Sequence, residues 1–241
     1  MSEINWVNDH FRFPVLSSSP LETQNLGELL GRSIRFPQRP GIGERPPTTG
    51  ALIGLVGELG AGKTTFTQGL ARGLDVHAHI TSPTFTLINE YTSTSQDLHL
   101  FHVDSYRLAG DSESLAGEMY GLGMDEILDI LDEEPLNDRA RPTDPAPMRH
   151  VVVIEWADRL SDLLPADRLM VRFASAADEQ SSLVTDQTRL THDLTGGRMH
   201  MMDGNGSERT LSFCATGPHS GALLAEMRTA MDPVQRQDAI R

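Results

Sequence analysis

Short, mostly apolar runs recur along the chain and predict buried strands. They fall at residues 52–56, 98–103 and 151–154. Runs of this length without regular alternation are typical of strands that are covered on both faces. Two later segments, 169–173 and 209–214, alternate between apolar and polar residues and also predict strands.

Apolar residues three and four positions apart predict helices before, between and after these strands. The first helix spans 21–34, with Ser19 or Thr23 as a possible N-cap. A second helix begins near Lys63 and a third pattern covers 111–131. A last short helix is predicted at 223–231.

The remaining segments are rich in proline, glycine or polar residues, and they set the expected domain organisation. We expect one domain over 19–231, preceded by a mobile or extended lead-in at 1–18 and followed by a tail at 232–241. Three polar insertions are expected within it, at about 36–50, 132–149 and 174–208.

A phosphate-binding loop is predicted between the first buried strand and the helix that follows it. Residues 57–64 fill the pattern G-x-x-x-x-G-K-S/T. Its glycines let the backbone turn tightly, so that N–H groups and the helix dipole can face phosphate oxygens. We expect nucleotide contacts from the whole loop: Gly57, Glu58, Leu59, Gly60, Ala61, Gly62, Lys63, Thr64 and Thr65.

Within this loop, Lys63 and Thr64 carry the chemistry. The Lys63 ammonium is expected at the β- and γ-phosphates, and the Thr64 hydroxyl is expected to bind the Mg²⁺ that bridges them. Lys63 is the only lysine among 20 lysine and arginine residues. A compact ammonium is therefore kept where a flat guanidinium could not replace it.

Two carboxylates follow buried strands and are candidates for the metal side of this site. Asp104 follows the run 98–103, and Glu155 follows the run 151–154. A strand end would hold such a carboxylate rigidly beside Mg²⁺ bound to Thr64. Either residue could instead be an ordinary polar strand end.

Hydroxyl-bearing residues precede the apolar run at 98–103. Ser82, Thr84 and Thr86 lie in the segment 79–91, which has the pattern of a loop that enters a strand. The three hydroxyls could sense a γ-phosphate, as switch loops do. They could equally lie on the solvent face of an ordinary strand.

Charge and composition restrict the class of partner and the compartment. The formal net charge is -14, and a chain that grips nucleic acid alone normally presents a basic face. The acidic residues between 110 and 145 are expected to form a solvated surface. No stretch is apolar enough to span a membrane and the N-terminus lacks a secretory signal, so we expect a cytoplasmic protein.

Cysteine and histidine give little support for a metal site built by the protein alone. Cys214 is the single cysteine, which excludes an internal disulfide and a cysteine-based zinc site. The pairs His77/His79 and His99/His102 are expected to be solvent-facing or packing residues, because strand residues three apart face opposite sides.

Four motifs in this order resemble the TsaE (also YjeE) family, bacterial ATPases needed to make threonylcarbamoyladenosine in tRNA. They are the phosphate loop at 57–65, S-P-T-F-T-L at 82–87, H-V-D-S-Y-R-L at 102–108 and I-E-W at 154–156. The resemblance covers roughly residues 19–35, 50–131 and 150–173. The three insertions depart from the family pattern but leave these motifs intact.

The resemblance implies an α/β fold, with a P-loop NTPase-like central sheet flanked by helices. It implies ATP and Mg²⁺ as cofactors, with Glu155 on Mg²⁺, Asp104 near the γ-phosphate and the attacking water, and Lys63 on the phosphates. It further implies hydrolysis that drives the cycle of a threonylcarbamoyl-transfer complex, with partner proteins of the TsaB and TsaD type. The tRNA would be reached only through these partners.

Other P-loop functions are weighed against the same residues. A small-molecule kinase would usually add an arginine-rich lid, and the only compact arginine pair is Arg139 with Arg141. A GTP switch would need N-K-x-D, which a chain with one lysine cannot form. A nucleotide sensor that does not hydrolyse ATP stays open.

Overall fold

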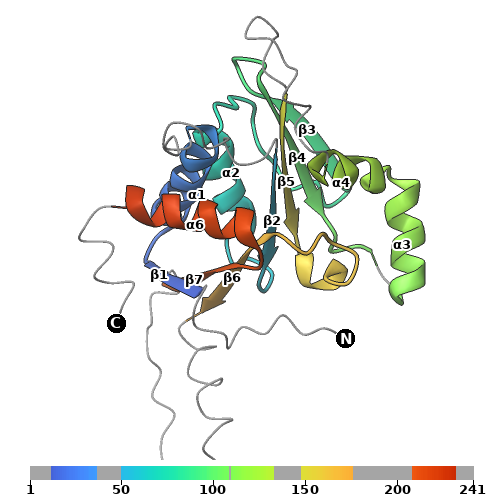
Figure 1. The fold of residues 1–241 in the computed structure, drawn as a ribbon. Coiled ribbons are helices and arrows are strands. Elements are labelled where there is room, and N and C mark those ends of the chain that lie inside the picture. Colours follow the sequence, from blue (N-terminus) through green and yellow to red (C-terminus); the bar gives the residue numbers. More distant parts are fainter. Residues whose placement is uncertain (1–11, 37–49, 109, 133–147, 176–207, 232–241) are drawn as a thin grey trace, which may run out of the picture.

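The fold is organised around one seven-stranded sheet with the strand order β1-β7-β6-β2-β5-β4-β3 (Figure 1). The computed structural model describes residues 12–36, 50–108, 110–132, 148–175 and 208–231. The strands are β1 (Arg12–Ser17), β2 (Gly50–Val56), β3 (Ile88–Thr92), β4 (Leu98–Asp104), β5 (Arg149–Glu155), β6 (Leu169–Ser175) and β7 (Arg209–Ala215). The helices are α1 (Pro20–Arg35), α2 (Lys63–Gly73), α3 (Ser112–Gly121), α4 (Met124–Asp132), the short 3₁₀ helix η2 (Ala157–Leu160) and α6 (Pro218–Ala230).

The centre of the sheet is parallel and its margins are antiparallel. Strand β2 pairs in parallel with β5 and β6, and β4 pairs in parallel with β5. Strands β3, β7 and β1 join in antiparallel fashion at the two sides. The predicted α/β class with a central sheet between helices is confirmed.

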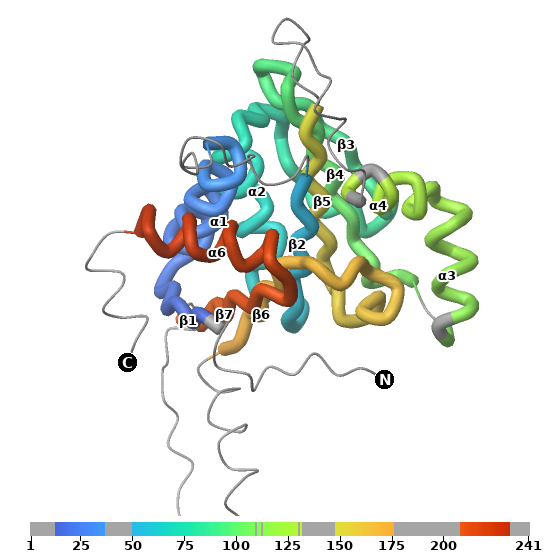
Figure 2. The backbone as a smooth tube through the Cα atoms, viewed as in Figure 1, coloured from blue at the N-terminus to red at the C-terminus, as the bar shows by residue number. Residues whose placement is uncertain are grey.

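Helices cover both faces of the sheet, as the backbone tube shows in the same view (Figure 2). On one face, Leu30 of α1, Phe66 of α2 and Leu224 of α6 pack with Val153 and Val171. On the other face, helices α3, α4 and η2 pack on the intervening residues of the same strands. Successive strand residues point to opposite faces, so a strand covered on both sides must be apolar throughout.

Glycines bring α1 and α2 into close contact. A Cβ atom added at Gly27 or Gly31 of α1 would lie 2.2 Å or 2.4 Å from a backbone oxygen of α2. A Cβ added at Gly69 or Gly73 of α2 would lie 1.9 Å or 2.2 Å from a backbone oxygen of α1. Because none of these glycines can carry a side chain here, the two backbones fix the position of α2.

Residues 12–17 form an edge strand. For this part of the expected lead-in, the extended alternative holds and the mobile one is wrong. Strand β1 pairs with β7, and its side chains Phe13 and Val15 are buried. Pro14 between them lacks an N–H group, which an edge strand tolerates. The proline and the neighbouring serines hid the alternating pattern from sequence analysis.

The predicted helices are present, with different limits at two places. Ser19 caps α1, since its hydroxyl accepts a hydrogen bond from the Glu22 backbone N–H at 3.2 Å. The pattern at 111–131 divides into α3 and α4 at Gly123, whose φ of 70° breaks the helix. Helix α6 begins earlier than predicted because Pro218 suits the first helical position.

The expected insertions at 36–50, 132–149 and 174–208 fall mostly outside the described residues, as do 1–11 and the tail 232–241. Their margins contain regular structure, since β2 begins at Gly50, β5 begins at Arg149 and β6 continues to Ser175. The domain limits of 19–231 stay a prediction. Within the described ranges, no helix combines the length and apolarity needed to cross a membrane.

Candidate functional site

The phosphate loop joins the end of β2 to the start of α2 at the edge where the parallel strands end. Gly60 and Gly62 have φ angles of 77° and 103°, which glycine adopts without the steric cost that a Cβ would bring. Gly62 is the N-cap residue of α2, and no side chain caps the helix there. The first-turn N–H groups of α2 thus form the kind of terminus that binds anions.

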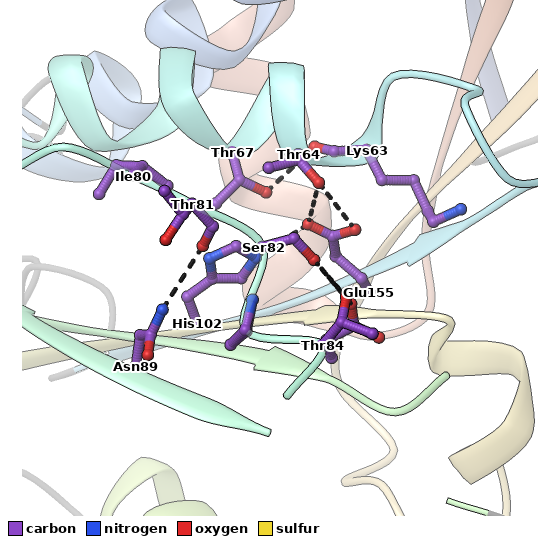
Figure 3. Close-up of polar contacts among 12 residues, drawn as sticks. Lys63, Thr64, Thr67, Ile80, Thr81, Ser82, Thr84, Asn89, His102 and Glu155 are labelled. Atoms are coloured by element: carbon purple, nitrogen blue, oxygen red, sulfur yellow. Dashed lines mark hydrogen bonds and ion pairs between the residues drawn. The ribbon is translucent and has the colours of Figure 1, made fainter. Parts of the chain in front are cut away.

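Lys63 is buried and extends away from Thr64 toward the loop (Figure 3). Its Nζ donates hydrogen bonds to the carbonyl oxygens of Gly57 at 2.6 Å and Glu58 at 2.9 Å. The same Nζ lies 3.7 Å from the centre of the Trp156 ring. Loop carbonyls and an aromatic face therefore hold the ammonium.

Burial lowers the pKa of Lys63 from its ordinary value, because desolvation disfavours the ammonium. The carboxylates of Glu155 and Asp104 partly oppose this shift. Phosphate oxygens would add negative charge beside the ammonium and favour its charged form.

Thr64 contacts the carboxylate at the end of β5. Its Oγ1 donates to Glu155, at 2.8 Å from Oε1 and 3.1 Å from Oε2 (Figure 3). A threonine hydroxyl that donates its hydrogen still has lone pairs for a cation. The structure thus brings together the two predicted metal ligands, which are 91 positions apart in the chain.

Asp104 lies opposite Glu155 in the β4–β5 register and is held by the 82–86 loop. Its Oδ2 accepts hydrogen bonds from Ser82 Oγ at 2.8 Å and Thr84 Oγ1 at 2.7 Å. Its Oδ1 accepts one from the Tyr106 backbone N–H at 2.9 Å. Four polar groups from two segments, the 82–86 loop and residues 104–106, therefore meet at one strand end.

Strand β3 begins only at Ile88, so the alternative that placed the hydroxyls on the solvent face of a strand is wrong. Ser82 and Thr84 lie on a loop that contacts the candidate site. Thr86 instead donates to Asn89 Oδ1 at 3.0 Å.

Sequence reasoning missed three residues around the phosphate loop. His102 was expected to be a solvent-facing or packing residue, yet its Nε2 lies 2.9 Å from Glu155 Oε1. Arg209, at the start of β7, donates to the Ala61 carbonyl oxygen at 2.8 Å. Trp156 was named only as part of the I-E-W motif, yet its ring lies against Lys63. The spacing His102-x-Asp104 was the available signal, since strand residues two apart share a face.

Trp156 occupies a strained backbone conformation that directs its ring. Its φ is 62°, in the left-handed region that non-glycine residues seldom adopt. The Ser105 hydroxyl lies 2.8 Å from the Trp156 carbonyl oxygen and 3.0 Å from that of Glu155. The indole packs on the Tyr106 ring, with 5.0 Å between ring centres. These contacts hold the ring beside Lys63.

The oxygen donors at this edge fit Mg²⁺ that is shared with a nucleotide. Thr64, Glu155 and Asp104 supply a hydroxyl and two carboxylates, which are the hard ligands that Mg²⁺ prefers. In the described part of the chain, no group of three or more histidine, cysteine, aspartate or glutamate residues could hold a metal by itself. Mg²⁺ is usually held by one or two carboxylates together with substrate phosphates, which suits this set.

Comparisons with known proteins agree on one family. The model "Threonylcarbamoyl adenosine biosynthesis protein TsaE" matches residues 17–183. A Bacillus subtilis protein described as "tRNA threonylcarbamoyladenosine biosynthesis protein TsaE" is 33% identical over 153 residues, covering 64% of this chain and 75% of the relative. A Treponema pallidum protein with the same description is 31% identical over 163 residues, covering 68% of this chain and 92% of the relative.

A solved structure supports the fold independently. The crystal structure of Bacillus subtilis YdiB aligns with a TM-score of 0.51 at 23% sequence identity, covering 90% of this chain and 95% of that chain. The matched family model and relatives show the family of this chain. The solved structure shows that its fold is similar. The chain therefore belongs to the TsaE family of threonylcarbamoyladenosine biosynthesis proteins.

Proposed function

We propose that this chain is a Mg²⁺-dependent ATPase that supports threonylcarbamoyladenosine modification of tRNA. The observation that carries the proposal is the contact between Thr64 of the phosphate loop and Glu155 at the end of β5. In phosphate-loop ATPases, a loop hydroxyl and a strand-end carboxylate together bind the metal that accompanies the nucleotide. Family membership supports the tRNA modification as the process.

In this proposal, each residue has a separate task. The loop N–H groups and Lys63 bind the phosphates, and Lys63 leaves the carbonyls of Gly57 and Glu58 to do so. Thr64 and Glu155 would hold Mg²⁺, which would supply positive charge to the phosphates when bound. Asp104, fixed by its hydrogen bonds, orients the attacking water.

The 82–86 loop would report the presence of the γ-phosphate. Its hydroxyls from Ser82 and Thr84 contact Asp104. A nearby γ-phosphate offers competing acceptor oxygens, so ATP would order the loop differently from ADP. Hydrolysis would then drive the cycle of a threonylcarbamoyl-transfer complex with partners of the TsaB and TsaD type.

Partner proteins are also favoured by the surface beside the site. Leu59 of the phosphate loop and Phe85 of the 82–86 loop are 79% and 87% exposed. We count these two side chains, on loops that line the site, as candidates for contacts with partner proteins. The net charge of -14 offers little counterion release for RNA binding, so the partners would supply most of the tRNA affinity.

The test is ATP turnover by the purified chain together with its partner proteins, followed as phosphate release. Glu155→Gln should lower Mg²⁺-dependent turnover by on the order of 100-fold, because charge placed at a transferring phosphoryl group is a large catalytic contribution. Asp104→Asn should lower turnover while largely sparing ATP affinity. Asp97→Asn is the matched control, since Asp97 precedes the opposite end of β4.

Several outcomes would contradict the proposal. Wild-type turnover in both Glu155→Gln and Asp104→Asn would show that these are ordinary strand ends. ATP binding without turnover in the complete complex would favour a non-hydrolysing sensor, and phosphate transfer to a small molecule would favour a kinase. Sub-micromolar tRNA binding by the isolated chain in physiological salt would refute the indirect action on tRNA.

A further inference from the structure

His102 has an unusual environment for a residue that only packs in a core. Its side chain is fully buried in β4, on the sheet face that α2 covers. Asp104, two residues later on the same face, is the register partner of Glu155. His102 is therefore the diagonal neighbour of Glu155 across two paired strands, and its Nε2 lies 2.9 Å from Oε1 (Figure 3).

The surroundings of the ring determine which nitrogen carries a hydrogen. Nδ1 of His102 has no hydrogen-bond partner among the described residues. A hydrogen placed only there would leave a buried donor unpaired and would set the Nε2 lone pair against a carboxylate oxygen. With the hydrogen on Nε2, the ring donates to Glu155 Oε1.

We propose that His102 is a positioning residue that fixes the Glu155 carboxylate for the metal. Hydrogen bonds to this carboxylate come from two described side chains, Thr64 and His102. Thr64 has one hydrogen, which it shares between Oε1 and Oε2, so this bond does not distinguish the two carboxylate oxygens, whereas His102 contacts Oε1 alone. His102 is then the donor that keeps Glu155 in place.

This role rests on the proposed function, because it concerns the Mg²⁺ that Thr64 and Glu155 would hold. His102 takes up a lone pair of Oε1, whereas Oε2 accepts only the longer bond from Thr64. The carboxylate is thus oriented before any ligand arrives. Outer partners of this kind typically change metal affinity by about 10- to 100-fold when they are removed.

The test measures Mg²⁺ binding without turnover. ADP is titrated calorimetrically into the full chain in EDTA and at increasing Mg²⁺, which gives the apparent Mg²⁺ affinity of the ADP-bound protein. In His102→Phe, that affinity should fall about 10- to 100-fold, while ADP affinity in EDTA stays unchanged. His102→Gln keeps an N–H donor and should recover most of the loss.

His99→Phe is the matched control, because His99 lies on the same strand but faces the opposite side. It should bind Mg²⁺ as the wild type does. Wild-type Mg²⁺ affinity in His102→Phe would overturn the role of His102 alone. A wild-type protein whose ADP affinity is insensitive to Mg²⁺ would overturn the proposed function as well.

A spectroscopic measurement on the unmodified protein covers the case in which His102→Phe does not fold. The ¹⁵N chemical shifts of the His102 ring distinguish a protonated nitrogen from an unprotonated one. Nε2 should carry a hydrogen that is protected from solvent exchange. An Nε2 without a hydrogen would overturn the proposal.

Discussion

Replacing Gly69 by alanine should force α1 and α2 apart. The added Cβ would lie 1.9 Å from the Gln24 carbonyl oxygen, whereas ordinary contacts begin at 3.4 Å. The shortfall of about 1.5 Å falls on backbone atoms of a helix, which cannot rotate away as a side-chain tip can. One helix must therefore shift as a unit.

Two opposing effects set the size of the change. Alanine is favoured over glycine in a helix by about 1 kcal/mol. Overpacking a filled core costs about 1–3 kcal/mol. The cost of Gly69→Ala should lie at the upper end of this range, because the new Cβ would meet rigid backbone atoms. The free energy of unfolding should thus fall by about 1–2 kcal/mol.

Urea unfolding followed by circular dichroism measures this difference. Gly117→Ala is the matched control, because a Cβ at Gly117 in α3 would meet nothing within 4 Å. At this position only the higher helix propensity of alanine over glycine matters. Gly117→Ala should therefore raise the free energy of unfolding by about 0.5–1 kcal/mol.

The two substitutions should therefore have opposite signs. Gly69→Ala should also weaken ATP binding, since α2 carries Lys63 and Thr64 at its N-terminus. A Gly69→Ala protein that is as stable as Gly117→Ala, with unchanged ATP affinity, would refute the argument that glycine contacts fix α2.

Three further predictions follow from individual contacts. Lys63, the only lysine, should lose reactivity toward amine labels when MgATP is added, as measured by mass spectrometry; equal labelling would contradict phosphate contact. MgATP should change the fluorescence of Trp6→Phe but not of Trp156→Phe, because Trp156 contacts Lys63; the reverse would place the nucleotide elsewhere. The Ser95 hydroxyl, with Ser93 and Arg149, lowers the pKa of Asp97 from 3.8 to about 2. A carboxyl group whose pKa is lower in the folded than in the unfolded state stabilises the fold at pH values above its unfolded pKa. This stabilisation is lost as the pH falls through the folded pKa. At neutral pH, Asp97→Asn should therefore lower the free energy of unfolding by up to about 1 kcal/mol, a small figure because the Asp97 carboxyl group is partly exposed to solvent. Urea unfolding at a series of pH values should show the difference from the wild type shrinking between pH 3.8 and about 2. A difference that does not change with pH would contradict this prediction.

The sequence by itself determined the elements whose signals are local. Strands β2, β4 and β5 are buried on both faces, so continuous apolar runs marked them without knowledge of their neighbours. The phosphate loop was also visible, because its chemistry needs glycines, Lys63 and Thr64 at fixed spacing. Asp104 and Glu155 could be named as candidates, since each ends such a strand.

Only the tertiary structure decided which of these residues meet. The pairing of β4 with β5 sets His102 beside Glu155, and no spacing along the chain encodes which strands are neighbours. Long-range contacts likewise bring Arg209 to Ala61 and place the 82–86 loop on Asp104. The sequence did not predict edge strand β1 or the glycine contact between α1 and α2, for the same reason. A glycine or a proline looks the same in sequence whether it breaks an element or packs against a distant one.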